Sequence, residues 1–174
     1  MTDRDASDAG DPAAELLRTV TAVWFEIDHT DGSGVSAYFT EDATLTIADA
    51  RFRGTAQIDA LYATRHDRGP RVSRHCVTNL HLLQADTRSA RAVSTLILYA
   101  EDGVAPRRLM QPVLLADVHD EFHRSGGRWR IRDRRIVTQF MPEDAVLAVP
   151  TGEHPTIRPG NPPGGTRDDP ATPA

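Results

Sequence analysis

The first third of the chain has its apolar residues at helical spacing. Asp11 and Pro12 form a helix start, because aspartate is a favoured N-cap and proline a favoured first helical residue. The turn-rich segment TDGSG follows at 30–34, so we expect this helix to end near Asp28 or His29. The predicted buried face consists of residues three or four positions apart: Leu16, Val20, Val23, Trp24 and Ile27.

Further helices and a hairpin are predicted next. The segment VSAYF at 35–39 predicts a short second helix, and 55–66 predicts a third, with Thr55 as its candidate cap. In that third helix, Ile58, Leu61 and Tyr62 have helical spacing. Between the two, residues 43–54 alternate on both sides of a polar turn, which is typical of a β-hairpin.

Four long strand-like segments complete the pattern, at about 72–84, 90–99, 109–122 and 128–139. Each exceeds the usual strand length, so we expect a strongly curved, mostly antiparallel sheet with bulges. Because helices come first and a meander of strands follows, the predicted class is α+β rather than alternating α/β.

Length and composition predict one folded domain with a flexible segment at each end. A chain of 174 residues suits a single domain with a tail. We expect a flexible acidic leader at 1–11 and the domain at 12–141. Residues 142–174 hold 8 of the 12 prolines, which predicts a disordered or loosely attached tail.

Composition excludes several classes of function. The formal charge of −5 argues against general nucleic-acid binding. All 20 basic residues are arginine, which excludes Schiff-base catalysis and a P-loop lysine. Cys76 is the single cysteine, which excludes an internal disulfide and a Cys-rich metal site. No apolar run reaches membrane-span length and the N-terminus has no apolar signal segment, so we expect a soluble cytoplasmic protein.

The strand-like stretch SRHCVTN (73–79) contains a histidine and an asparagine that need an explanation. Alternation predicts one face with His75, Val77, Asn79 and His81, and an opposite face that begins with Cys76. A half-buried histidine is most often structural, whereas a general base needs a partner that sets its tautomer. Asn79 would either point inward beside His75 or occupy an irregularity of the sheet.

Asp28 is the best candidate for that partner. It is predicted at the C-terminal end of the first helix, where the helix dipole disfavours a carboxylate unless a donor or a cation compensates. Asp28 also shares a helix face with Trp24, four residues earlier, and therefore the side that packs on the sheet. The alternative interpretation is a solvated aspartate at a helix end.

Other chemistry-bearing residues allow two interpretations each. Trp24, Tyr38 and Tyr62 would line a pocket or belong to the core. His119 and His123 would share a strand face but lack an evident third ligand, so we expect no metal site. In the arginine-rich stretch 128–135, the alternation predicts Arg130, Arg132 and Arg134 on a solvated or subunit-facing edge, and a bulge turning Arg135 inward or into a salt bridge.

Three segments in this order resemble a known family: FTEDA (39–43), SRHCVTN (73–79) and GRWRIRDRRIV (127–137). Together with the helical start, they resemble the SnoaL-like branch of the nuclear transport factor 2-like superfamily over about 12–141. That group includes polyketide cyclases, and its shape relatives include scytalone dehydratase, ketosteroid isomerase and hexachlorocyclohexane dehydrochlorinase. The resemblance implies a cone-shaped barrel in which helices pack on a curved sheet around an apolar pocket.

The resemblance also implies residue roles. In dehydratase-like members, an aspartate at the end of the first helix and a histidine on the first long strand form an acid–base dyad, and these match Asp28 and His75. The second histidine of scytalone dehydratase is not matched, because we place Leu114 at its position. The lysine and arginine that assist halide loss in the dehydrochlorinase are not matched either.

These observations predict a lyase or isomerase that acts on an apolar, polyketide- or steroid-like molecule without a cofactor. His75 would be the base, Asp28 its partner, and Trp24, Tyr38, Tyr62, Asn79 and Leu114 pocket residues. The alternative is a non-catalytic module that binds a hydrophobic ligand or another protein. The apolar positions Val93, Ile97, Val113 and Leu115, with Thr95, would face outward, so we expect a homodimer or homotrimer.

Overall fold

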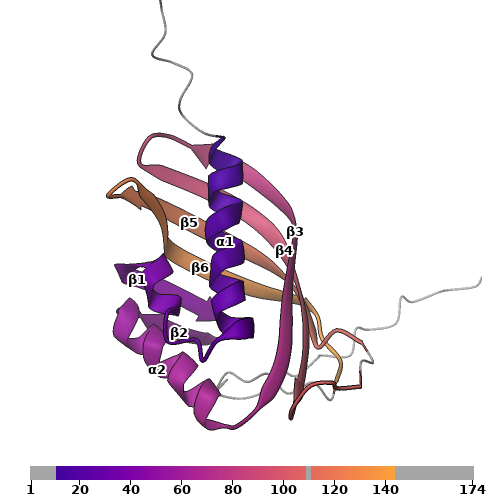
Figure 1. The fold of residues 1–174 in the computed structure, drawn as a ribbon. Coiled ribbons are helices and arrows are strands. Elements are labelled where there is room, and N and C mark those ends of the chain that lie inside the picture. The colour runs from indigo at the N-terminus through magenta and orange to yellow at the C-terminus, as the bar shows by residue number, and fades with distance from the viewer. Residues whose placement is uncertain (1–10, 109–110, 144–174) are drawn as a thin grey trace, which may run out of the picture.

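Two helices and one short 3₁₀ helix lie on one side of a six-stranded sheet (Figure 1). The structure, a computed structural model, describes residues 11–108 and 111–143. Its elements are α1 (Pro12–His29), η1 (Val35–Tyr38), β1 (Phe39–Ile47), β2 (Ala50–Arg53), α2 (Gly54–Asp67), β3 (Arg71–Ala85), β4 (Ser89–Asp102), β5 (Leu114–Ser125) and β6 (Arg128–Phe140). Their order confirms the predicted α+β class.

Helix α1 begins and buries its face as the sequence predicts. The side chain of Asp11 accepts a hydrogen bond from the backbone N–H of Ala13 at 3.0 Å, and Pro12 opens the helix. The five predicted apolar residues are its buried face. Helix α2 differs at its start, because Arg53 rather than Thr55 is its N-cap. The backbone N–H of Arg53 donates to Gln57 Oε1 at 2.8 Å.

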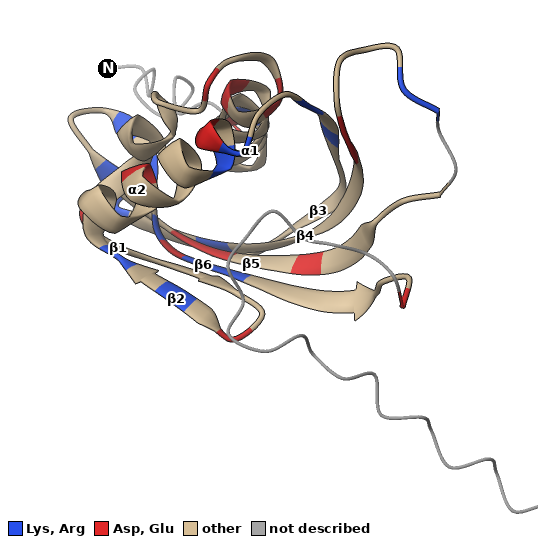
Figure 2. Ribbon diagram, turned by 90° about the horizontal axis from the view of Figure 1, so that it is seen from below, with Lys and Arg blue, Asp and Glu red and all other residues tan. Residues whose placement is uncertain are grey.

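The strand order is β2-β1-β6-β5-β4-β3, and the sheet does not close into a barrel. β1 pairs with β6 in parallel, and the other neighbouring strands pair antiparallel. Figure 2 shows the sheet curving around α1 and α2, which both lie on its concave side. The helices therefore cover one face of the sheet and enclose the space in which the candidate site lies.

A bulge in β3 changes which residues face inward. Asn79 has φ +54°, and the register with β4 shifts between Thr78 and His81. A bulge adds one residue, so the alternation of faces reverses beyond it. His75 faces the interior before the bulge, whereas Asn79 and His81 are exposed. The predicted shared face of His75, Asn79 and His81 is therefore wrong, and Asn79 occupies the sheet irregularity.

A second irregularity corrects the prediction for the arginine-rich strand. The register between β5 and β6 shifts between Glu121 and Phe122, and an extra residue in β6 turns Arg134 toward the core. Arg134 is 1% exposed and forms two hydrogen bonds with Asp120, at 2.7 and 2.8 Å. Arg135, which we expected to turn inward or to form a salt bridge, is exposed and forms no salt bridge with another residue of the described ranges.

Some predictions fall on residues that the structure does not describe. The expected leader and tail lie outside the described residues, apart from Asp11, Pro142 and Glu143. The expected start of the third long strand at Leu109 also lies outside them, and β5 begins at Leu114. Among the helices of the described ranges, none is long and apolar enough to span a membrane.

Candidate active site

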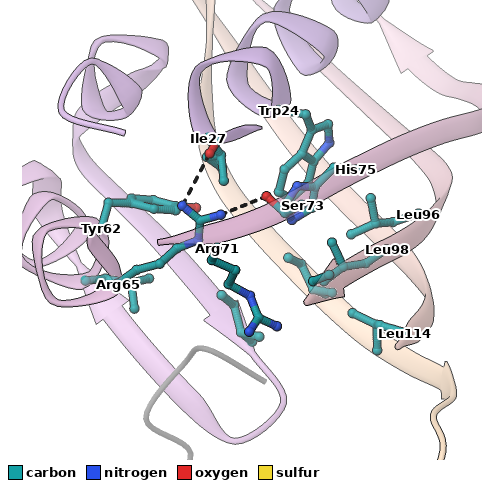
Figure 3. A pocket seen from close by; sticks show the side chains of 14 residues that line it. Trp24, Ile27, Tyr62, Arg65, Arg71, Ser73, His75, Leu96, Leu98 and Leu114 are labelled. Carbon is teal, nitrogen blue, oxygen red and sulfur yellow. Dashed lines mark hydrogen bonds between the residues drawn. The ribbon is translucent and has the colours of Figure 1, made fainter. Parts of the chain in front are cut away.

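An open pocket lies between the helices and the concave face of the sheet (Figure 3). Its wall is mostly apolar, formed by Trp24, Ile27, Ile47, Leu61, Leu96, Leu98, Ala100, Leu114 and Ile136. Its polar lining residues are Tyr62, Arg65, Arg71, Ser73 and His75. A mostly apolar cavity with a few convergent polar groups is the usual form of a small-molecule site.

Asp28 is held at this pocket by three hydrogen bonds. Its Oδ2 accepts from the backbone N–H of His75 at 2.7 Å. Its Oδ1 accepts from the Ser73 hydroxyl at 2.7 Å and lies 2.7 Å from His75 Nδ1. These donors come from the start of β3, packed against the C-terminal end of α1. They compensate for the helix dipole that disfavours a carboxylate there.

The His75 ring lies between Asp28 and Trp24. Its side chain is 10% exposed, and that of Asp28 is 5% exposed. The imidazole stacks on the Trp24 indole, with ring centroids 4.4 Å apart and an angle of 9° between the planes. Within the described part of the chain, no hydrogen bond occupies His75 Nε2. The ring is thus fixed through Nδ1 and one face, while Nε2 remains available.

Burial and hydrogen bonding set the charges of the pair. Burial lowers the pKa of His75, and this outweighs the hydrogen bond and charge of Asp28, which raise it. Burial raises the pKa of Asp28, but the hydrogen bonds and charge of His75, with the Ser73 hydroxyl, bring it below its ordinary value. At neutral pH the pair is therefore an aspartate and a neutral imidazole. Because the carboxylate carries no proton, Nδ1 holds the imidazole proton and Nε2 the free lone pair.

Arg65 extends this network from α2. Its Nη2 donates to the Ser73 hydroxyl at 2.8 Å, and its Nη1 donates to the Ile27 carbonyl at 3.3 Å. The Ser73 hydroxyl in turn donates a hydrogen bond to Asp28 Oδ1. Burial lowers the pKa of Arg65, the charge of Asp28 raises it, and the charge of Arg71 lowers it further. A cation thus supports the carboxylate through one hydroxyl, without a direct ion pair.

Two further groups shape the electrostatics of the pocket. Burial raises the pKa of Tyr62 to about 12, although the charges of Arg134 and Arg65 oppose the rise, so its hydroxyl keeps its proton at neutral pH. The guanidinium carbon of Arg134 lies 4.9 Å from the centroid of the Trp24 ring, a cation–π contact. The buried Arg134–Asp120 pair therefore supports the indole on which His75 stacks.

The structure brings together most of the predicted site residues. His75 and Asp28 are in hydrogen-bond contact, and Trp24, Tyr62 and Leu114 line the pocket. Two predicted pocket residues lie elsewhere. Tyr38 ends η1 and packs, half-buried, against the core, and Asn79 is exposed. In the described ranges, no group of three or more His, Cys, Asp or Glu residues is placed to hold a metal ion.

Three polar pocket residues were not predicted from the sequence. Arg71 and Ser73 alternate with His75 on β3, so the period of the strand could have placed them on the same face. Arg65 lies one helical turn beyond Leu61, whose side chain is buried at the same pocket. Only the packing of α2 against β3 reveals that Arg65 reaches Ser73.

Comparison with solved structures identifies the fold. ActVI-ORFA from Streptomyces coelicolor is 24% identical, over 77% of this chain and 96% of that one, with a TM-score of 0.63. A putative scytalone dehydratase from Novosphingobium aromaticivorans is 15% identical, over 81% and 93%, with a TM-score of 0.65. The beta subunit of a putative aromatic-ring-hydroxylating dioxygenase from the same organism is 12% identical, over 80% and 96%, with a TM-score of 0.67.

Sequence comparison gives the family. No curated protein matches the chain significantly. The model of the SnoaL-like domain matches residues 12–135, which include both helices, strands β1 to β5, the first part of β6 and every residue of the pocket except Ile136. The chain therefore belongs to the family of SnoaL-like domains.

Proposed function

We propose that the chain is a cofactor-independent lyase or isomerase that acts on an apolar, cyclic, polyketide- or steroid-like molecule. One observation carries the proposal: Asp28 binds Nδ1 of a buried histidine whose Nε2 is unpaired beside an apolar pocket. A base needs a partner that fixes its tautomer and surroundings that limit access of water; the contact with Asp28 supports the first condition, and the mostly apolar lining of the pocket supports the second.

In the proposed reaction, Nε2 of His75 takes a proton from a carbon next to a carbonyl group. Asp28 and the Trp24 face stabilise the imidazolium that forms. Returning the proton to another carbon completes an isomerisation. Transferring it to a departing hydroxyl forms water and completes a dehydration. The Tyr62 hydroxyl, which also lines the pocket and is protonated at neutral pH, would donate a hydrogen bond to the substrate oxygen on which charge develops.

The comparisons support this reaction class at the level of the fold. One solved relative carries the name of a putative scytalone dehydratase, and dehydration is one of the reactions proposed here. A fold hosts many functions, however, so the specific chemistry rests on the site residues.

A non-catalytic module is the second candidate, and Leu114 favours it. Leu114 is 4% exposed and lines the pocket. By our sequence-based assignment, it takes the position of the second histidine of scytalone dehydratase, so a second acid–base group is missing there. A single base is sufficient for an isomerisation or a syn elimination, in which one group both removes and returns the proton. A module that only binds an apolar ligand needs neither Asp28 nor a fixed tautomer of His75.

The two candidates are separated by an exchange assay. A panel of cyclic ketones and β-hydroxyketones is incubated with the protein in deuterated water, and NMR follows deuterium incorporation and water loss. The variants are His75→Gln, Asp28→Asn and, as a matched control, His66→Gln on the exposed surface of α2. General-base catalysis contributes on the order of 10²–10⁴-fold, so His75→Gln should lose about that much.

The outcomes differ for each candidate. Catalysed exchange that is lost in His75→Gln and retained in His66→Gln supports the enzyme. Exchange that survives in His75→Gln rejects His75 as the base. Ketones that bind to the wild-type protein without any exchange favour the binding module.

A further inference from the structure

The lining of the pocket includes positively charged side chains that take no direct part in the proposed reaction. Two arginines, Arg65 and Arg71, are among the residues that line it, and no aspartate or glutamate is among them. The remaining wall is apolar apart from Ser73, Tyr62 and a histidine that is neutral at neutral pH. A guanidinium group beside an apolar wall is costly unless an anion or several acceptors compensate it.

Arg65 already has its acceptors. Its two terminal nitrogens donate to the Ile27 carbonyl and to the Ser73 hydroxyl. Figure 3 shows its side chain crossing from α2 toward those two groups. Arg65 therefore belongs to the support of Asp28, and its donors are directed at protein atoms.

Arg71 is in a different position. Its Nη1 contacts Asp102, its cross-strand neighbour on β4, and the structure records no other hydrogen bond for its side chain among the described residues. A guanidinium has five N–H donors. The Arg71 side chain is 13% exposed, whereas that of Asp102 is 76% exposed. The mostly buried cation thus has one carboxylate partner, which itself lies mostly in solvent, and solvent screening weakens the attraction between the two charges.

The geometry of β3 relates Arg71 to the base. Arg71, Ser73 and His75 alternate along the strand and all line the pocket. At about 3.3 Å per residue, the Cα atoms of Arg71 and His75 are roughly 13 Å apart. Figure 3 shows the Arg71 side chain extending away from His75, toward the end of the pocket where Leu114 lies. A molecule that reaches from His75 to Arg71 would therefore extend along the strand.

We infer that the pocket selects an apolar ring molecule with a carboxylate group, which Arg71 binds at the mouth while the ring lies against Leu96, Leu98 and Leu114. The inference rests on the proposed function for the identity of the reacting end, which is placed at His75. Arg71 is then the residue that determines specificity. It orients the substrate by its anionic end and takes no part in proton transfer.

A pair of probes of the same shape tests the inference. Naphthoic acid is ionised near neutral pH, and naphthalenemethanol carries a neutral hydroxyl in the same place. Binding of each is measured by calorimetry and by quenching of tryptophan fluorescence in the wild-type protein and in Arg71→Gln. Arg91→Gln is the matched control, because Arg91 carries the same charge on an exposed position of β4 and does not line the pocket. Arg71→Lys, which keeps the charge but not the planar guanidinium, is the conservative variant.

The expected result is a preference for the acid that depends on Arg71. A charged hydrogen bond is worth roughly 10-fold or more in affinity, so the wild-type protein should bind the acid about that much more tightly than the alcohol. Arg71→Gln should abolish the preference and leave the affinity for the alcohol unchanged, which also shows that the pocket is intact. Arg91→Gln should keep the full preference, and Arg71→Lys an intermediate one.

Other outcomes overturn the inference and leave the proposed function separately testable. Equal affinity of the wild-type protein for both probes excludes a selective anion site, and a preference that survives in Arg71→Gln excludes Arg71 as its origin. Absence of binding of either probe also overturns it. None of these results bears on deuterium exchange at His75, which depends on the base and not on the carboxylate.

Discussion

Asp28 contacts His75 twice, because one carboxylate oxygen lies 2.7 Å from the ring Nδ1 and the other accepts from the backbone N–H at 2.7 Å. The ring and the main chain of one residue are thus bound to one carboxylate. This arrangement orients the imidazole more strictly than a side-chain contact alone. It also gives the end of α1 a fixed position on β3.

Replacing Asp28 by asparagine should change the titration of His75 without unfolding the protein. The charge and hydrogen bond of Asp28 raise the pKa of His75, so their loss should lower this pKa further and weaken the preference for a proton on Nδ1. Loss of this charge-assisted network should reduce the free energy of unfolding by about 1–3 kcal/mol. NMR titration of the ring and urea unfolding measure both effects, and Asp31→Asn on the exposed loop should show neither. An unchanged His75 titration would contradict the role given to Asp28.

Stability should fall on acidification through the protonation of His75. The folded-state pKa of His75 lies below the ordinary value of 6.5, so between the two the unfolded chain binds more protons. The free energy of unfolding therefore decreases as the pH falls below about 6.5 and levels off below the folded-state pKa. The lowered pKa of Asp28 adds a loss at lower pH, beginning near its ordinary value of 3.8.

Urea unfolding across the pH range checks this dependence. His75→Gln should remove the first part of the loss, whereas His66→Gln, at an exposed position, should leave it in place. The same protonation should give any catalysed reaction an acidic limb, with the rate rising as His75 loses its proton. A pH profile of stability that is the same in the wild type and in His75→Gln would reject the lowered pKa.

The buried Arg134–Asp120 pair should be sensitive to the loss of one partner only. Arg134→Met leaves the carboxylate of Asp120, which is 3% exposed, without its cation. Breaking such a pair costs about 3–5 kcal/mol, whereas replacing both partners with apolar residues is often close to neutral. Urea unfolding should therefore show that adding Asp120→Leu recovers most of the loss. Arg132→Met, on the same strand but exposed, is the control and should change little.

The bulge at Asn79 should tolerate glycine and resist β-branched residues. With φ at +54°, Asn79→Gly keeps the backbone conformation, whereas Asn79→Val should cost about 1–2 kcal/mol. Thr78→Val, one residue earlier and also exposed, should have almost no effect on urea unfolding. Equal stability of Asn79→Val and the wild type would argue against a left-handed residue at this position.

We further expect the protein to form a homodimer or homotrimer through the convex face of the sheet. Ile97 and Leu115 are register partners on β4 and β5, and neither belongs to the core on the concave side. An apolar patch of this kind usually marks an interface. Light scattering should show an oligomer at micromolar concentration and a monomer for Ile97→Asp. A monomeric wild-type protein would reject the expectation.

The sequence alone determined the elements and much of the candidate pair. The periodicity of α1, its cap and its end at His29 are local properties, and the structure agrees with them. Asp28 could be selected because a carboxylate at a helix C-terminus requires compensation, and His75 because a histidine in an apolar strand requires a reason. The family resemblance relates the two residues as a pair without reference to their positions in space.

Only the tertiary structure decided the faces of the sheet and the charges of the pocket. A bulge shifts every later side chain to the opposite face, and its position depends on pairing between strands, which no local pattern reveals. For this reason the alternation along the strands assigns Arg134 to the wrong face and leaves Asn79 open between the pocket and the bulge. The contacts of Arg65 with Ser73, and of Arg71 with Asp102, likewise arise from packing between distant segments. The pKa values of Asp28 and His75 follow from this packing, since burial and hydrogen bonds set them together.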